Sequence, residues 1–183
     1  MKDFYEALAS SERNAAIPKE DDFFGMLIGS WYIDYMDTAT GAVRKGEWHF
    51  SRVLEGMAVQ DVIVLPHFEY GTTLRMYNPA TRTWEIAYGY TGRIMRFEAR
   101  KQEDRIVLSS LEDEHRKWVF AEIAENHFHW QDIMVQQDGE WQVNYDLYAK
   151  RRNECCTQQR KKLPDNEVSG CLRDCEPVCL RTG

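Results

Sequence analysis

Three acidic side chains lie within segments where apolar and polar residues alternate, a pattern typical of strands. Residues two positions away from each carboxylate are mostly large and apolar, so the acidic side chain shares their face. A carboxyl group in an apolar interior has a raised pKa, which suits it to act as a general acid or base near neutral pH. We expect such a role first for Asp132, between Trp130 and Met134, then for Glu122 and then for Asp61.

Two arginines are the natural partners of these carboxylates. Arg75 in TLRMY and Arg96 in IMRFE each lie between bulky residues in the middle of an alternating segment. An ionised carboxylate buried alone is costly, so it must be paired or protonated. Two interpretations stay open. The charged residues form a structural ion-pair network or lie on the outer face, or they form an interior polar cluster that orients a ligand carboxylate, carbonyl or hydroxyl group.

Four aromatic residues are predicted to line a ligand cavity beside these polar groups. The prediction rests on strand parity, because successive side chains of a strand point to opposite faces. The four are Trp31, Tyr35, Trp130 and Tyr145. Trp141 and Val143 are expected to share the inward face of the last segment with Tyr145. Arg75 or Arg96 is expected to form the polar end of the cavity.

The sequence offers histidines but no complete metal or nucleophile motif. His127 and His129 are two residues apart, so they point the same way on a strand, and His49 could supply a third metal ligand. Their face is opposite that of Trp130, so we expect exposed histidines, with a general-base role for His129 as an alternative. The chain has no nucleophile elbow, phosphate loop or dinucleotide fingerprint. We therefore expect no metal and no cofactor.

The elements that would position these residues follow Gly29. From there to Lys150 the chain consists of short alternating runs separated by turn signals such as DTATG, NPATR and QQDGE, with no helix-length interruption. The runs cover about residues 31–36, 44–52, 57–64, 71–77, 83–89, 93–100, 105–110, 116–124, 127–135 and 141–150. This pattern predicts an all-β fold, an antiparallel up-and-down barrel of about ten strands with room for a small molecule.

The segment before Gly29 is predicted to close one end of the barrel. Residues 2–10 and 19–28 are predicted to form two short amphipathic helices, the second with acidic residues in its first turn. Gly29 permits a sharp change of direction, and Trp31 can then fill the closed end. The predicted organisation is a helical segment over 1–28, a barrel domain over 29–152 and a tail over 153–183.

Gly29 and Trp31 resemble the Gly-x-Trp opening motif of the calycin superfamily, which includes lipocalins and fatty-acid-binding proteins. Residues 20 to 152 resemble the small bacterial calycin-like proteins of domain-of-unknown-function family 1579. The segments that carry this resemblance are YGTTLRMYNPATRTWEIAY, GR, DRIVL, RKWVFAEIAENHFHW and DGEWQVNYDLYAKRR. It implies a lipocalin-like barrel and adds almost no chemistry. Asp34 and Tyr35 stand where the haem-binding nitrobindin branch is glycine-rich, which argues against haem.

The tail over residues 153–183 differs in composition from the rest of the chain. It contains all five cysteines and no aromatic residue. We expect a flexible tail that is dispensable for folding, with metal binding and disulfide or redox use as the alternatives. Cys171, Cys175 and Cys179 are spaced four apart, whereas zinc ribbons prefer two residues between ligand cysteines.

Composition limits the partners of this chain. The formal net charge of −7 over 183 residues argues against nucleic acid and against an anionic membrane surface. No apolar run approaches the roughly 20 residues that span a bilayer, and the N-terminal residues lack the apolar region of a secretory signal. A cytoplasmic protein is therefore expected.

These observations favour a non-catalytic carrier or sensor that binds a small, mostly apolar molecule inside the barrel. A first alternative is a small-molecule biosynthetic enzyme, an isomerase, cyclase or lyase that uses a carboxylate in the same cavity. A second is a barrel filled by its own side chains that acts as an interaction module. The sequence also leaves a homodimer open.

Overall fold

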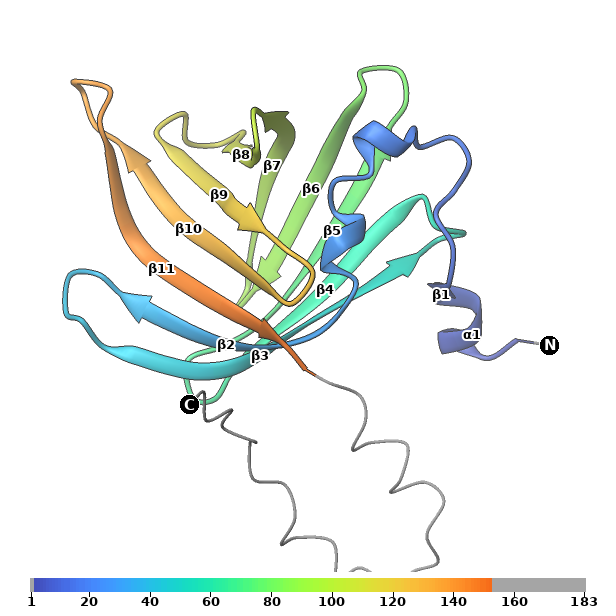
Figure 1. Cartoon of the computed structure of the whole chain (residues 1–183), viewed down its shortest axis with the longest axis horizontal. Coiled ribbons are helices and arrows are strands. Elements are labelled where there is room, and N and C mark those ends of the chain that lie inside the picture. Colours follow the sequence, from blue (N-terminus) through green and yellow to red (C-terminus); the bar gives the residue numbers. More distant parts are fainter. Residues whose placement is uncertain (1, 153–183) are drawn as a thin grey trace, which may run out of the picture. The chain divides into compact units, whose positions relative to one another are not determined.

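The computed structural model describes residues 2–152, which form a closed antiparallel β-barrel (Figure 1). Ten strands follow one another along the chain, as the alternating pattern predicts. They are β2 (Gly29–Asp37), β3 (Val43–Val53), β4 (Ala58–Leu65), β5 (Glu69–Asn78), β6 (Thr83–Tyr90), β7 (Arg93–Gln102), β8 (Arg105–Ser110), β9 (Arg116–Ile123), β10 (His127–Val135) and β11 (Trp141–Arg151). The predicted fold class is therefore confirmed. The predicted tail lies outside the described residues.

The barrel closes where its last strand pairs with its first. β11 runs antiparallel to β2, in a register that pairs Arg151 with Trp31 and Tyr145 with Asp37. The other pairs within β2–β11 join strands that are consecutive in the chain. A short strand, β1 (Ala9–Ser10), adds two residues beside the end of β3. Every strand from β2 to β11 thus has two neighbours, which is the property that defines a closed barrel.

The N-terminal segment contains much less α-helix than the sequence predicts. The first predicted helix is reduced to α1 (Phe4–Leu8), none of whose residues is buried. The second is replaced by two 3-10 turns, η1 (Lys19–Asp21) and η2 (Gly25–Leu27). The prediction of a helix over residues 19–28 was therefore wrong.

Contacts with the barrel explain the irregular path of this segment. Asp22 accepts two hydrogen bonds from the guanidinium of Arg52 on β3, at 3.0 and 2.7 Å. Ile17, Phe24 and Leu27 are completely buried in the barrel core. The chain bends to bury these three side chains, so tertiary packing outweighs the helical pattern. Through these three side chains the segment packs against the barrel core.

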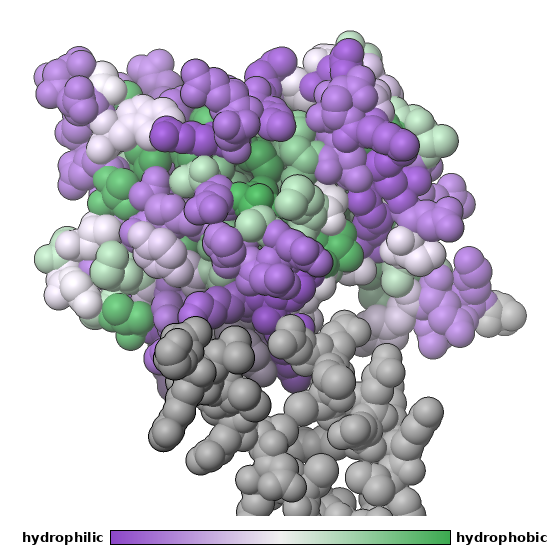
Figure 2. Space-filling view, viewed as in Figure 1, coloured by the Kyte–Doolittle hydropathy of each residue, from purple (hydrophilic) through white to green (hydrophobic). Residues whose placement is uncertain are grey.

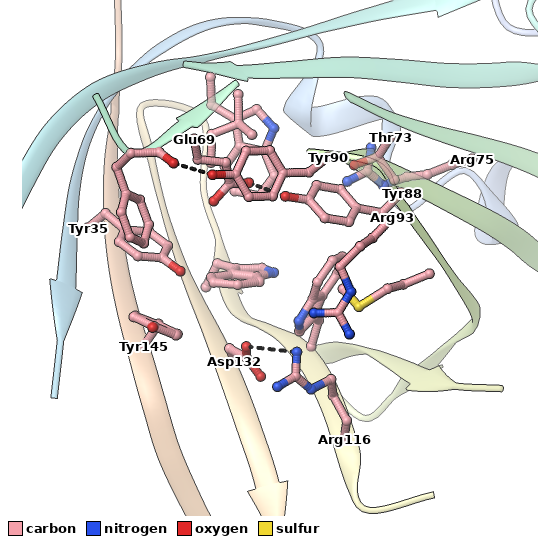
Figure 3. A pocket seen from close by; sticks show the side chains of 16 residues that line it. Tyr35, Glu69, Thr73, Arg75, Tyr88, Tyr90, Arg93, Arg116, Asp132 and Tyr145 are labelled. Atoms are coloured by element: carbon pink, nitrogen blue, oxygen red, sulfur yellow. Dashed lines mark hydrogen bonds and ion pairs between the residues drawn. The ribbon is translucent and has the colours of Figure 1, made fainter. Parts of the chain in front are cut away.

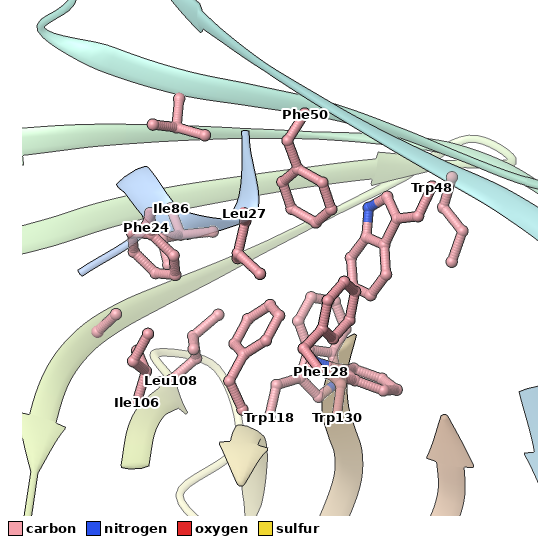
Figure 4. Packing of buried hydrophobic residues seen from close by; sticks show 14 of the residues in the cluster. Phe24, Leu27, Trp48, Phe50, Ile86, Ile106, Leu108, Trp118, Phe128 and Trp130 are labelled. Atoms are coloured by element: carbon pink, nitrogen blue, oxygen red, sulfur yellow. The ribbon is translucent and has the colours of Figure 1, made fainter. Parts of the chain in front are cut away.

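Large side chains fill the half of the barrel next to this segment (Figure 4). Trp31 is completely buried, donates a hydrogen bond from Nε1 to the carbonyl of Leu27 at 2.7 Å, and packs edge-on against Phe128. The guanidinium of Arg151 lies 4.1 Å from the centre of the Trp31 ring. Burial of each such side chain contributes about 1.5–3 kcal/mol. This half of the barrel is a packed core.

Two register shifts change which residues face the interior. The pairing of β9 with β10 shifts between Phe120 and Glu122, and the pairing of β11 with β10 shifts between Val143 and Tyr145. Each shift is a β-bulge, in which one extra residue reverses the inside–outside alternation. The inward orientation predicted for Trp141 and Val143 was therefore wrong: Trp141 is 40% exposed, and Val143 packs against a second, smaller apolar cluster.

The surface of the described residues is mixed. On the face shown in Figure 2, hydrophilic residues predominate and hydrophobic ones lie in small groups between them. Phe4, Tyr70 and Ile94 are among the large apolar side chains that remain exposed. Within residues 2–152, no helix has the length and apolar character needed to cross a bilayer.

Candidate functional site

The half of the barrel away from the N-terminal segment contains a cavity of about 350 Å³ (Figure 3). Most of its lining residues lie near the ends of strands that meet at the β2–β3, β4–β5, β6–β7, β8–β9 and β10–β11 turns, which places the mouth at this end. The lining consists of Tyr35, Trp48, Ile63, Phe68, Glu69, Thr73, Arg75, Tyr88, Tyr90, Arg93, Met95, Arg116, Trp118, Trp130, Asp132 and Tyr145. A cavity of this size suits a small organic molecule.

Aromatic rings form much of the cavity wall, since eight of the sixteen lining residues are Trp, Tyr or Phe. Tyr35 stacks on Tyr145 with 5.0 Å between ring centres, and its ring centre lies 6.4 Å from that of Trp130. The structure thus places these three residues in the lining, where the sequence predicted them. Trp31 is not part of the lining, because it lies near the start of β2 and belongs to the packed half.

A buried ion pair lies at the inner end of the cavity. Arg75 on β5 and Asp61 on β4 are each 1% exposed, and Arg75 Nη1 donates to Asp61 Oδ2 in a short contact. The backbone N–H of Thr73 donates to the other carboxylate oxygen at 3.2 Å. The guanidinium also lies 5.1 Å from the ring centre of Phe24. Arg75 therefore forms an ion pair with Asp61 and also lines the cavity.

Arg96 lies outside the barrel, so its predicted place at the polar end of the cavity was wrong. It is exposed, and its Nε donates to Glu112 at 2.8 Å. The reason is the parity of β7. Phe97 is 1% exposed and Met95 lines the cavity, so the inward face of this strand also includes Arg93 and excludes Arg96.

Asp132 lies in the cavity wall, as predicted. It is 5% exposed, and its Oδ2 lies 3.7 Å from Nη1 of Arg116. Among the described residues, its buried Oδ1 has no hydrogen-bond partner. Burial raises the pKa of the Asp132 carboxyl group, and the positive charge of Arg116 partly opposes this. The arrangement supplies a carboxyl group that could exchange a proton with a bound molecule.

Glu122 is exposed on the outer surface, so the inward orientation predicted for it was wrong. Its Oε1 lies 3.1 Å from Nε2 of His127. The bulge after Phe120 reverses the alternation of β9, and the next residue packed against the core is Ile123. A bulge leaves no clear signal in a short alternating segment, which explains the error.

Glu69 is a cavity residue that the sequence argument missed. It lies at the start of β5 and accepts a short hydrogen bond from the hydroxyl of Tyr88 on β6. Burial raises the pKa of the Glu69 carboxyl group, and the hydrogen bond from Tyr88 opposes this. A Cβ at Gly71 would lie 2.9 Å from the Tyr88 ring, so a glycine at this position makes room for the tyrosine. Glu69 follows a turn, where alternation gives no orientation.

Arg93 and Arg116 are two further cavity residues that were not predicted. Arg93 begins β7 and Arg116 begins β9, and both line the mouth half of the cavity. Strand parity contains the signal in each case. Arg93 shares a face with Phe97, and Arg116 shares a face with Trp118, and both aromatic residues are buried.

The three histidines singled out in the sequence lie on the outside of the barrel wall, as parity predicts for His127 and His129. His129 Nε2 lies 2.5 Å from Asp146 Oδ1, and its ring stacks on that of Tyr148. His49 contacts the hydroxyl of Ser30 at 2.9 Å. Within residues 2–152, no group of three or more His, Cys, Asp or Glu side chains has an arrangement that could hold a metal ion.

Comparisons with known proteins give two distant structural similarities to report. No family model matches the chain, and no curated protein matches it. The crystal structure of Rv2717c from M. tuberculosis is similar with a TM-score of 0.47 and 11% sequence identity, over 78% of this chain and 100% of that one. A redesigned β-barrel is similar with a TM-score of 0.32 and 13% identity, over 79% and 100%.

Proposed function

We propose that this protein binds a small, mostly apolar organic molecule in the barrel cavity, as a carrier or sensor. The observation that carries this proposal is the cavity of about 350 Å³, with aromatic rings along its walls and its mouth at the end opposite the N-terminal segment. Aromatic walls with a few polar groups are typical of small-molecule sites. A barrel filled by its own side chains, and acting as an interaction module, is less compatible with a cavity of this size.

Filling the cavity tests this proposal. Met95 lines the cavity, and its neighbour Ile94 is 76% exposed on the outer face of the same strand. Met95→Trp should occupy the binding space, while Ile94→Trp is the matched control. Isothermal titration calorimetry with methyl 2-naphthoate, a flat neutral probe, should detect binding to wild type and to Ile94→Trp and much weaker binding to Met95→Trp. Native mass spectrometry of the purified protein should also reveal any organic ligand that copurifies.

A second candidate function is enzymatic, and one observation favours it. Asp132 is buried in the cavity wall beside Arg116, and its pKa is raised. A carboxyl group of this kind can transfer protons in an isomerase, cyclase or lyase reaction. Against an identified substrate, Asp132→Asn should then lower the rate by roughly 10²–10⁴-fold. A variant that turns over substrate normally would show that Asp132 is structural, and a wild-type protein that binds small molecules but turns none of them over would leave the carrier as the function.

We also propose that the chain is a calycin-like protein related to the domain-of-unknown-function family 1579. The support is the Gly29–Trp31 opening at the start of β2, the N-terminal segment across one barrel end and the closure of β2 against β11. A carrier role is compatible with that relationship.

A further inference from the structure

The charge of Arg75, at the inner end of the cavity, is already neutralised, and this affects how a ligand would lie in the cavity. Arg75 is paired with Asp61, and both are buried. A ligand anion at Arg75 would compete with a carboxylate that is held by the backbone N–H of Thr73 as well. Displacing Asp61 would leave it buried and unpaired, at a cost of several kcal/mol. The inner end of the cavity therefore favours the uncharged part of a ligand.

The mouth of the cavity has a different charge balance. Arg93 lines it without an ion-pair partner among residues 2–152, and Arg116 has one carboxylate neighbour, Asp132, at 3.7 Å. Both arginines are the first residues of their strands. The strand between β7 and β9 is β8, and it ends at Ser110, which pairs with Phe97. β8 therefore does not pair with the start of β7, where Arg93 lies. In Figure 3 both side chains extend towards the part of the cavity that holds Asp132.

The two mouth arginines are not both neutralised by other groups in the lining. Asp132, 3.7 Å from Arg116, is one carboxylate beside two guanidinium groups, and Arg93 has no ion-pair partner among residues 2–152. Glu69 is held by Tyr88 in another part of the cavity (Figure 3). Guanidinium groups that line the same end of a cavity repel each other, and an anionic group with two or more oxygen acceptors relieves that repulsion by binding both. Arg93 and Arg116 outnumber Asp132 in this part of the cavity, although the whole chain has a net charge of −7.

We propose that the ligand of this cavity is an aromatic anion, whose carboxylate, sulfonate or phosphate group binds Arg93 and Arg116 at the mouth while its ring system lies inside. This inference rests on the proposed ligand-binding function and names the class of ligand. The ring system follows from the walls, since Tyr35, Trp130 and Tyr145 offer faces for stacking. The anionic end is outermost, beside solvent, where its desolvation costs least.

Four probes with one ring system test the proposal. Methyl 2-naphthoate is neutral, 2-naphthoate and 2-naphthalenesulfonate are anions with different head groups, and 2-naphthylmethylammonium is a cation. Isothermal titration calorimetry on the full-length protein at neutral pH should give at least about 10-fold tighter binding for one of the anions than for the ester. The cation should bind most weakly. Added salt should weaken the binding of the anions and leave that of the ester unchanged.

Variants assign the preference to the two arginines. Arg93→Gln should lower the affinity for the tighter anion by about 3- to 10-fold and leave the ester unaffected. Arg96→Gln is the matched control, because Arg96 is on the same strand but faces outward, and it should change neither affinity. Asp132→Asn removes the carboxylate that competes for Arg116, so anion affinity should rise by about 2- to 5-fold. A gain of affinity is not expected from structural damage.

The outcomes separate this inference from the function on which it rests. If the ester binds as tightly as both anions, and Arg93→Gln changes neither, the anionic ligand class is wrong while the cavity remains a binding site. If Arg93→Gln weakens ester and anion equally, the arginine is structural and the inference also fails. If no probe binds to wild type, the proposed function fails and the ligand class fails with it. The tighter of the two anions indicates the head group.

Discussion

Asp132 is subject to two opposing effects, burial in an apolar wall and the charge of Arg116 at 3.7 Å. Burial is the larger effect, so the pKa of the carboxyl group is raised. Ionisation of Asp132 therefore costs more free energy in the folded protein than in the unfolded chain. A residue with this balance lowers stability at high pH, which is a recognised cost of functional sites.

We expect Asp132→Asn to become more stable than wild type as pH rises. Below the ordinary aspartate pKa of about 3.9 the carboxyl group is protonated in both the folded and the unfolded protein, so the two proteins should have similar free energies of unfolding there. As pH rises through the folded-state pKa of Asp132, wild type alone loses stability from this group. Urea unfolding at several values between about pH 3 and pH 8 measures the difference. A difference that shrinks or reverses with rising pH would mean that Arg116 outweighs burial.

Replacement of Arg75 should lower the stability of the protein, whereas replacement of Asp132 should raise it. Arg75→Met leaves the Asp61 carboxylate buried at 1% exposure without its partner, so we expect a loss of about 3–5 kcal/mol in the free energy of unfolding. The double variant Asp61→Asn/Arg75→Met should recover part of this loss, since no charge then remains. Arg96→Met, on the outer surface, should change stability by less than about 1 kcal/mol. Denaturant titration at neutral pH distinguishes these variants.

At the scale of elements, the sequence predicts the number and order of strands better than their faces. Alternation and turn signals locate all ten strands, because each run of the pattern ends at a recognisable turn. The faces of Glu122 and Trp141 are wrong because each lies beyond a bulge that reverses parity. Arg96 is wrong for another reason. Large residues stand on both sides of Arg96, so the alternation does not show which face of β7 is inward. The burial of Phe97 shows it.

The N-terminal segment shows the other limit of the sequence argument. Its apolar residues and acidic first turn are compatible with a helix, and they were interpreted in this way. The local sequence pattern does not indicate that Arg52, on another strand, lies beside Asp22. Its two hydrogen bonds to Asp22 hold the chain between the two 3-10 turns. Of the cavity residues, Tyr35, Trp130, Asp132 and Tyr145 follow from alternation alone. Glu69 follows from no local pattern.

Gly46 provides a test of strand packing. A Cβ at this position of β3 would lie 2.2 Å from the carbonyl oxygen of Val64 on β4, so Gly46→Ala must push the two strands apart. We expect a loss of about 1–3 kcal/mol in the free energy of unfolding. Gly89→Ala on β6 is the control, because no atom lies within 4 Å of its added Cβ. Equal stabilities for the two variants would contradict the close approach of β3 and β4.

At the scale of the whole molecule, the barrel is packed at one end and hollow at the other. The packed end contains Phe24, Trp31 and Phe128, all at most 1% exposed. The hollow end keeps polar and charged groups, among them Arg93 and Glu69, beside the mouth. A barrel of this design separates stability from binding, because the side chains that bury the most surface are remote from the cavity mouth.

Hydrogen exchange can test this separation. Saturation with methyl 2-naphthoate should slow amide exchange in peptides that cover residues 88–95, at the β6–β7 end of the cavity. Peptides that cover the β9–β10 turn, residues 124–126, should be unaffected beyond any global change in stability. Mass spectrometry of peptic fragments gives the exchange rates of both regions in one experiment. Equal protection at the two ends would place the ligand elsewhere.

The pairing of Arg151 with Trp31 has a consequence for how the chain reaches this structure. Nearly the whole barrel sequence separates these two residues, so the last pairing closes a long loop and is expected to form late in folding. Until β11 arrives, β2 and β10 present rows of unpaired N–H and C=O groups to other molecules. A chain that ends before Trp141 keeps both edges open, and it should aggregate rather than accumulate as a monomer.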